Sequence, residues 1–180
     1  RQGYAIAGAL ARLGAQVTLV SGPVTLATPP GVRRIAVESA REMADAVDAA
    51  LPADAAVMVA AVADWRVDAA PRKLAKGEMG DRLALVPNPD ILATLAHGAR
   101  RPRLVIGFAA ETHDVIEHAA GKRARKGADW IVANDVSGDV MGGTANAVHL
   151  VTAGGVESWE RMDKDLVAER LAERIAHALA

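Results

Sequence analysis

The alternation of apolar runs with amphipathic segments is the feature that most restricts how this chain can fold. AAVMVAAVA (55–63), RLVIGFAAE (103–111) and DWIVAND (129–135) each contain several consecutive apolar residues. Such runs are typical of parallel strands that are covered by helices on both faces. Segments 39–51 and 114–127 have the apolar spacing of helices. The pattern predicts an α/β fold, a three-layer Rossmann-like sandwich with a mostly parallel sheet.

The remaining segments complete this prediction. Gly154-Gly155 lies between two short strand-like runs, which predicts an antiparallel C-terminal hairpin at 147–161. Strands are expected at 15–22, 32–37, 55–63, 82–86, 103–111 and 129–135, and helices at 3–14, 39–51, 87–99, 114–127 and 162–180. We expect residues 1–180 to form a single domain, from which a glycine-rich segment preceding Arg1 is missing.

Composition excludes several classes of function. Hydrophobic residues make up 51% of the chain but aromatic residues only 3%, so Ala, Val, Leu and Ile must fill the core. The formal net charge of −1 argues against a nucleic-acid partner, since such proteins usually carry a basic excess. Without cysteine, there is no thiolate nucleophile and no cysteine zinc site. No apolar stretch approaches the roughly 18 residues that span a bilayer, so we expect no membrane partner and a cytoplasmic location.

The opening residues of the chain have features of a nicotinamide-dependent dehydrogenase. Residues 3–22 resemble the opening helix and second strand of the short-chain dehydrogenases. That family needs a Tyr-x-x-x-Lys pair, but Tyr4 is the only tyrosine and Gly8 stands where the lysine belongs. Ser21-Gly22 also replaces the expected acidic ribose partner. This catalysis is rejected, and a passive dinucleotide sensor remains possible.

Two basic clusters flank the expected carboxyl edge of the sheet. In α/β folds, ligands bind beyond the carboxyl ends of the strands, where Asp64, Phe108 and 134–135 are expected. Lys73 and Lys76 follow one strand end, and a second cluster, KRARK (122–126), ends a helix. Taken alone, KRARK is more simply a solvated run that complements the helix dipole. Two cationic clusters near one crevice fit a polyphosphate site better, since several cations offset its charge.

Short motifs along almost the whole chain carry a family resemblance. They are, in order, AAVADW, RKLAK, PNPDIL, GFAAET, the Lys-x-x-x-Lys pair in KRARK, IVANDV, and a glycine-rich stretch before Asn146-Ala147. In this order they resemble phosphopantothenoylcysteine synthetase, the CTP-dependent bacterial type.

The resemblance implies a reaction, its substrates and its partners. The family joins 4′-phosphopantothenate to cysteine through an acyl-cytidylate, consuming CTP with Mg²⁺ and releasing CMP and pyrophosphate. Charge stabilisation and positioning carry most of such a rate enhancement. The domain often follows a flavin-dependent decarboxylase, so FMN is expected only if that domain is attached. Homodimers are also implied.

The same resemblance assigns site residues position by position. It makes Lys73 the catalytic residue, which stabilises the acyl-phosphate centre. The nucleotide-binding positions that it implies are Met58, Val59, Ala60, Asp64, Lys73, Pro89, Asp90, Ile91, Leu92, Phe108, Lys122 and Lys126. Asp64 either binds nucleotide hydroxyls or a water on Mg²⁺. Fixed carbonyls at 58–60 or 107–110 are expected to select cytosine, because an unpaired polar group would penalise another base.

Departures from the family pattern leave alternatives open. Ala75 removes one cation of the lysine motif, and Met141 replaces an aromatic residue. No metal ligand is predicted, because the five histidines show no metal spacing. Any Mg²⁺ is expected on phosphate oxygens and water. A non-catalytic nucleotide- or dinucleotide-binding module is one alternative, and a dimerisation domain that pairs through the edge at 147–160 is another.

Overall fold

The central element of the structure is a five-stranded sheet. The computed structural model describes residues 1–69, 72, 73, 75, 83–136 and 145–180. The sheet has the order β3-β6-β7-β8-β9. Its strands are β3 (Ala55–Met58), β6 (Leu104–Glu111), β7 (Trp130–Asp135), β8 (Ala145–Thr152) and β9 (Gly155–Asp163). The first three strands are parallel and the last two antiparallel, which confirms a mostly parallel sheet with a C-terminal hairpin.

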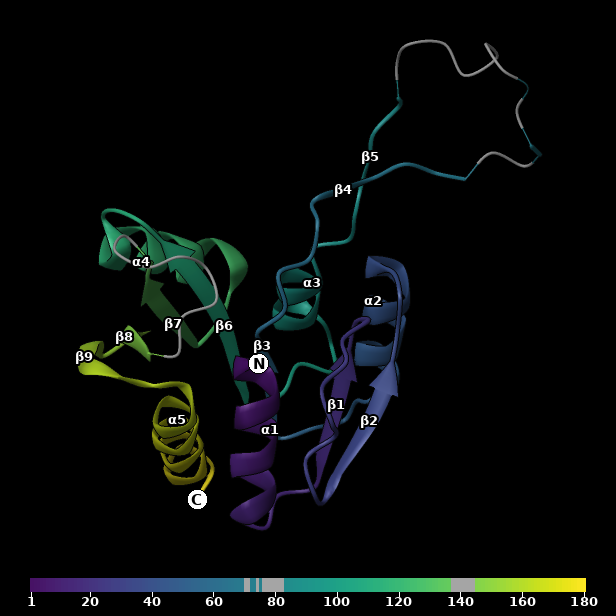
Figure 1. The fold of residues 1–180 in the computed structure, drawn as a ribbon. Coiled ribbons are helices and arrows are strands. Elements are labelled where there is room, and N and C mark those ends of the chain that lie inside the picture. Colours follow the sequence, from purple (N-terminus) through teal and green to yellow (C-terminus); the bar gives the residue numbers. More distant parts are fainter. Residues whose placement is uncertain (70–71, 74, 76–82, 137–144) are drawn as a thin grey trace.

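Helices cover both faces of this sheet and give the three layers that the sequence predicts (Figure 1). One face packs against α1 (Gln2–Arg12) and α5 (Lys164–Leu179). The other packs against α3 (Ile91–His97) and α4 (Val115–Lys126). Side chains of β6 alternate between the two cores: Ile106 lies in the first, Val105 and Ala109 in the second. This period-two alternation explains why a continuously apolar strand is stable in the middle of the sheet.

The strands at the N-terminal side differ in two ways from a single continuous sheet with a strand at 55–63. The strand predicted at 55–63 ends at Met58, and all four residues of β3 are only half-buried. The reason is position, because β3 is an edge strand of the five-stranded sheet, whose hydrogen-bonded neighbour is β6 alone among the described strands. β1 (Val17–Ser21) and β2 (Val32–Ala36) pair in parallel as a separate two-stranded sheet beside α2 (Ala40–Ala49).

A third difference is an extended arm that leaves the body of the molecule between β3 and α3. We call the described part of residues 64–87 the arm. Its strands β4 (Trp65–Arg66) and β5 (Val86–Pro87) pair antiparallel, and Figure 1 shows them projecting away from the helices and the main sheet. The sequence predicted a strand at 82–86. Among the described strands β5 covers Val86–Pro87 and pairs with β4 rather than with the main sheet, and residue 82 lies outside the described residues.

The surface of the arm is unusually apolar for an exposed segment. Trp65, Val67, Leu83 and Leu85 each expose half or more of their surface. Exposed apolar groups of this size, gathered on one segment, are typical of surfaces that become covered by another protein. None of the described helices has the length and apolar composition needed to cross a membrane.

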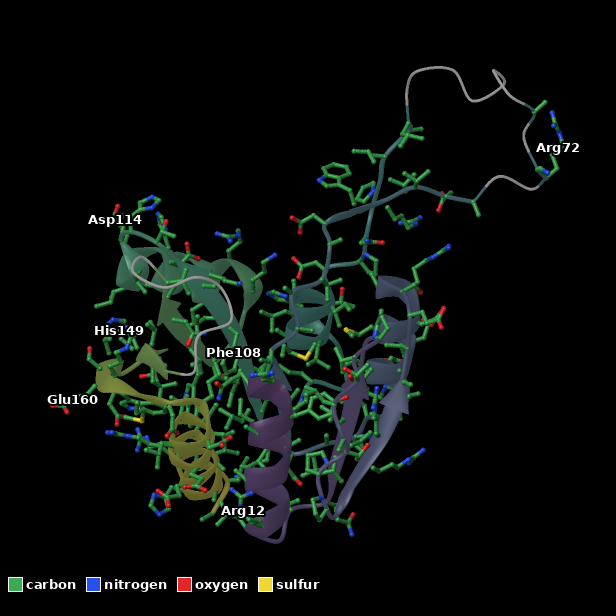
Figure 2. The ribbon with its side chains drawn as sticks, in the orientation of Figure 1. Arg12, Arg72, Phe108, Asp114, His149 and Glu160 are labelled. Atoms are coloured by element: carbon green, nitrogen blue, oxygen red, sulfur yellow. The ribbon has the colours of Figure 1, made fainter. Side chains whose placement is uncertain are left out.

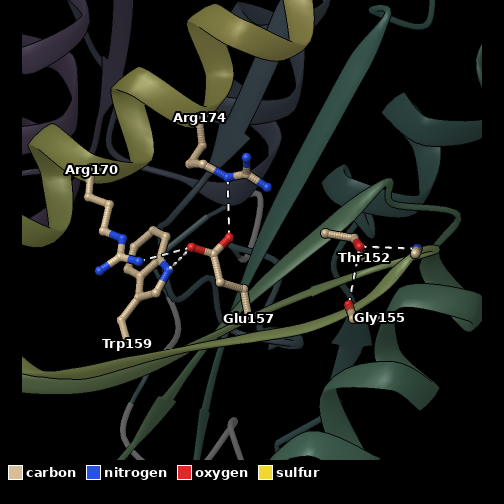
Figure 3. Close-up of polar contacts among 7 residues, drawn as sticks. Thr152, Gly155, Glu157, Trp159, Arg170 and Arg174 are labelled. Carbon is tan, nitrogen blue, oxygen red and sulfur yellow. Dashed lines mark hydrogen bonds and ion pairs between the residues drawn. The ribbon is translucent and has the colours of Figure 1, made fainter.

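Hydrogen bonds at its turn and a cluster of ion pairs stabilise the C-terminal hairpin. The hydroxyl of Thr152 accepts from Gly154 N at 3.1 Å and donates to Gly155 O at 3.1 Å (Figure 3). Glu157 accepts from Trp159 Nε1 at 2.9 Å and from Arg170 Nη2 at 3.0 Å, and its other oxygen lies 3.3 Å from Arg174 Nε. The indole hydrogen bond, followed by the two guanidinium groups, holds the pKa of Glu157 below its ordinary value.

Replacing Glu157 with Gln should make stability less dependent on pH. The depressed pKa stabilises the fold above the unfolded value of about 4.3, and this contribution is lost as the pH falls through the folded-state pKa. About a third of the side chain is exposed, so we expect a loss of about 1 kcal/mol or less at pH 7 and a smaller loss at pH 3, below the unfolded pKa. Urea unfolding at both pH values measures the change in the free energy of unfolding. Glu160→Gln, on the same strand, is the control. An equal loss at both pH values would contradict the assignment.

Candidate functional site

The carboxyl end of β6 carries the first cation of the candidate site. Lys122 reaches from α4 to this end, where its Nζ donates to the carbonyl of Phe108 at 2.7 Å. Burial is the largest influence and lowers the pKa of Lys122, while Glu111 opposes the shift and Lys126 adds to it. The ammonium group is therefore partly stripped of water and held in a fixed position. A cation in such a place attracts an anion more strongly than a fully hydrated lysine does.

The second cation of this pair joins α4 to the start of α3. Lys126 contacts the carboxylate of Asp90, whose other oxygen accepts from Ala93 N at 3.1 Å and so caps α3. The KRARK run is therefore more than a solvated surface, since two of its lysines face the ends of β6 and α3. The Asp90 carboxylate already accepts a hydrogen bond from one N–H group at the start of α3. A phosphate bound there would have to share that N–H donor with Asp90.

The other predicted positions of the 89–92 segment are mainly structural. The side chain of Ile91 is buried. The side chain of Leu92 packs closely against Gly107, since a Cβ atom added at Gly107 would lie 2.8 Å from Leu92 Cδ2. Leu92 and Ile91 therefore anchor α3 to the sheet. Asp90 is the exposed residue of the segment, while Pro89 and Leu92 are half-buried, and any contact with a nucleotide by Ile91 or Leu92 is left to their backbone groups.

The end of β3 lies beside the end of β6. Met58 is paired with Gly107, the residue before Phe108. Val59 lies against the first turn of α1, since a Cβ at Gly3 would be 3.5 Å from Val59 Cβ. Ala60 is exposed. This stretch therefore offers backbone groups at the same edge of the sheet as Lys122.

Asp64 lies at the base of the arm, next to the start of α3. Its carbonyl accepts from Asn88 N at 2.8 Å, and Asn88 Nδ2 donates to Ala63 O at 2.9 Å. The Asp64 side chain is exposed. Its carboxylate is free of the capping role that Asp90 has, and oxygen donors of this kind suit Mg²⁺. At the far side of the edge, Asn134 and Asp135 of β7 are paired with Ala110 and Glu111 of β6. The backbone of these two residues therefore lies at the sheet edge where the crevice was predicted.

Lys73 is the one predicted residue that the structure does not bring to this edge. It is exposed on the arm beside Arg72, whose Nη1 donates to Lys73 O at 3.3 Å. Figure 2 shows Arg72 at the far end of the arm, well away from α4. The expected meeting of Lys73 with Lys122 and Lys126 is therefore not present within this chain. Lys76 and Met141 lie outside the described residues.

Sequence reasoning missed one cluster, at the junction between β6 and α4. His113, Asp114 and His118 place potential metal-ligand atoms within 4.8 Å of one another. The expectation of no metal ligand stays a prediction, since the geometry shows only that these three side chains lie close to one another. The signal was present as His-Asp-x-x-x-His at the predicted strand–helix junction, where the first two residues precede the helix and the last lies one turn inside it.

Taken together, the layers and the paired lysines define a Rossmann-like α/β domain with two lysines at the carboxyl end of β6 and the start of α3. The chain belongs to the DNA/pantothenate metabolism flavoprotein C-terminal domain family, which matches residues 1–179.

Curated relatives agree with this family. The chain is 44% identical over 181 residues to the coenzyme A biosynthesis bifunctional protein CoaBC of Vibrio parahaemolyticus. This match covers 97% of the present chain and 45% of the Vibrio protein. It is 46% identical over 177 residues to the protein of the same name from Escherichia coli K12. That match covers 94% of the present chain and 42% of the Escherichia coli protein. The chain therefore spans about half the length of the curated relatives it matches.

Solved structures agree on the fold. A crystal structure of the C-terminal domain of CoaBC is 37% identical, with a TM-score of 0.80 over 99% of this chain and 82% of that one. A Cab2 mutant in complex with phosphopantothenate-cysteine has a TM-score of 0.54 at 14% identity, over 83% of this chain and 54% of that one. At that identity the second likeness concerns the fold alone.

Proposed function

We propose that this domain is a ligase that joins 4′-phosphopantothenate to cysteine in coenzyme A biosynthesis, with CTP as the activating nucleotide. The single observation that carries the proposal is the position of Lys122, partly buried at the carboxyl end of β6 and facing Phe108, with Lys126 one turn further along α4. This is where the family resemblance requires two nucleotide-binding lysines. The names of the relatives support the same pathway.

Two half-reactions account for the substrates. A carboxylate oxygen of 4′-phosphopantothenate attacks the α-phosphorus of CTP, and the bond to pyrophosphate breaks, which leaves an acyl-cytidylate. The amine of cysteine then attacks the acyl carbon, loses a proton and displaces CMP. The resting carboxylate is a poor electrophile, so conversion to a mixed anhydride supplies the leaving group. The protein contributes positioning and cations that stabilise the developing charge.

Residues at the edge of the sheet take the binding roles. Lys122 and Lys126 offset the charge of the triphosphate, and the backbone at 58–60 and beside Phe108 contacts the base and ribose. Pro89 and Asp90 border the phosphates at the start of α3. Asp64 offers oxygen donors through which, together with phosphate oxygens and water, Mg²⁺ would be held. Mg²⁺ would neutralise phosphate charge when bound.

We infer that the protein is a homodimer in which the arm carries Lys73 to the site of the partner subunit. Two observations on the arm support this. Trp65, Val67, Leu83 and Leu85 expose apolar surface that a partner would cover. Arg72, which precedes Lys73, lies at the far end of the arm, away from α4 of its own chain (Figure 2). In a two-fold dimer the same exchange happens twice, so both sites are completed.

The remaining expectations follow from the family. We propose that residues 1–180 act as one domain, that a flavin-dependent decarboxylase with FMN is fused to it in the whole protein, and that the reaction takes place in the cytoplasm. A nucleotide-binding module without catalysis is the second candidate, favoured by the position of Arg72 at the far end of the arm, away from α4 of the same chain (Figure 2).

Pyrophosphate release by the complete protein separates these functions. With Mg²⁺ and 4′-phosphopantothenate, we expect pyrophosphate from CTP and little from ATP, and CMP and the amide product once cysteine is added. Binding of CTP or NADPH in calorimetry without pyrophosphate release would instead favour the non-catalytic module.

A further inference from the structure

The junction between β6 and α4 gathers three side chains that commonly bind metal ions. His113 and Asp114 directly precede α4, and His118 lies one turn inside it, with ligand atoms of all three within 4.8 Å of one another. The two imidazole rings meet edge to face, with their centroids 5.0 Å apart. We propose that these residues form a binding site for a divalent transition-metal ion of the Zn²⁺ class, separate from the nucleotide site.

Hydrogen bonds outside the cluster orient both imidazoles as ligands. Nδ1 of His118 lies 3.3 Å from Glu111 Oε2, and Nδ1 of His113 lies 3.2 Å from Thr112 Oγ1. In the tautomer in which Nδ1 donates this bond, Nε2 of each ring is unprotonated and can bind a metal. A carboxylate that accepts from the second nitrogen of a ligating histidine fixes its tautomer and raises its basicity. Glu111 is in the position to do this for His118.

The carboxylate of Asp114 is also available. Asp114 stands at the N-cap of α4, but among the described residues no N–H group of the helix bonds to its side chain. Ser39, Asp90 and Asp163 all cap their helices in that way. The backbone of Asp114 is left-handed, with φ 45°, which directs the chain differently from an ordinary N-cap. Its carboxylate is therefore free to complete a two-histidine, one-carboxylate set.

The chemistry of the donors selects the kind of ion. Two imidazoles and one carboxylate favour Zn²⁺, Co²⁺ or Ni²⁺ over Mg²⁺, which prefers oxygen ligands. Ligand atoms on a tetrahedral ion with bonds of about 2.0–2.1 Å are separated by roughly 3.4 Å. The side chains must therefore close by about an ångström around the ion. All three are exposed, so they can rotate without disturbing the core.

Binding of ZnCl₂ and CoCl₂ to the complete protein, freed of metal by a chelator, tests the site. Calorimetry and the visible absorption of Co²⁺ should both show saturable binding of about one ion per chain, with no competition from excess Mg²⁺. We expect His113→Gln, His118→Gln and Asp114→Asn each to weaken binding by at least about ten-fold. His177→Gln, at an exposed position on α5, should leave it unchanged.

Glu111→Gln separates a built site from chance chelation by surface histidines. If Glu111 orients His118, this variant loses about ten-fold or more in Zn²⁺ affinity although it removes no ligand. Circular dichroism and thermal unfolding of each metal-free variant confirm that the fold is retained. Absence of saturable binding in the unaltered protein would overturn the proposal. Equal binding by the His118→Gln and unaltered proteins, or indifference to Glu111→Gln, would overturn it as well.

Discussion

Lys73→Gln should reduce CMP formation by about 10²–10³-fold while the domain stays folded, because it removes a positioned cation that stabilises the transition state. The reduction follows from the charge that develops on the acyl-phosphate centre in both half-reactions. The fold should be unaffected because Lys73 is exposed on the arm and packs in neither core. Chromatographic measurement of CMP with saturating CTP, 4′-phosphopantothenate and cysteine gives the rate.

Lys164→Gln is the matched control for Lys73→Gln. Lys164 begins α5, on the face of the sheet opposite α3 and α4, and the substitution changes the net charge by the same amount. It should leave the rate unchanged. Thermal unfolding of both variants checks the fold. Turnover at the unaltered rate in Lys73→Gln would remove this residue from the mechanism.

Lys122→Met should weaken CTP binding by about 10–100-fold, since a hydrogen bond to a charged group contributes about 1.5–3 kcal/mol. Lys122 is partly buried and already positioned by the Phe108 carbonyl, so little side-chain freedom is lost when phosphate binds. Methionine keeps the apolar stem and fills the same space against β6, so the domain should stay folded. Calorimetric titration with CTP and Mg²⁺ measures the loss.

Lys164→Met serves as the control for this second variant. An unchanged CTP affinity in Lys122→Met would mean that Lys122 only ties α4 to β6. It would also remove the observation on which the proposed function depends.

The layered fold was predictable because its signals are local. The apolar runs at β6 and β7 and the Gly154-Gly155 turn each determine their element almost alone, and the structure confirms them. The arm was not predictable in the same way. Residues 82–86 have the composition of a strand, but composition does not say which strand will be the partner, and β5 pairs with β4 instead of joining the sheet. For the same reason the run at 55–63 gave no sign that β3 would be an edge strand.

The candidate site was predictable only as far as strand ends and helix ends determine it. Lys122, Lys126, Asp90 and Phe108 come together because β6, α3 and α4 are adjacent in the fold. The position of Lys73 depends on the path of the arm, which no local pattern determines. The His-Asp-x-x-x-His spacing of His113, Asp114 and His118 does not by itself show that the three side chains meet, because their meeting also depends on the left-handed backbone of Asp114.

The central claim is that Lys73 of one subunit and Lys122 of another complete the same catalytic site. Co-expression of Lys73→Gln and Lys122→Met chains with different tags, followed by isolation of the mixture, tests it most directly. In mixed two-fold dimers one of the two sites regains both lysines, so random assortment should restore about a quarter of the unaltered activity. Activity no higher than the sum of the two separate variants, in preparations shown to contain mixed dimers, would contradict the claim.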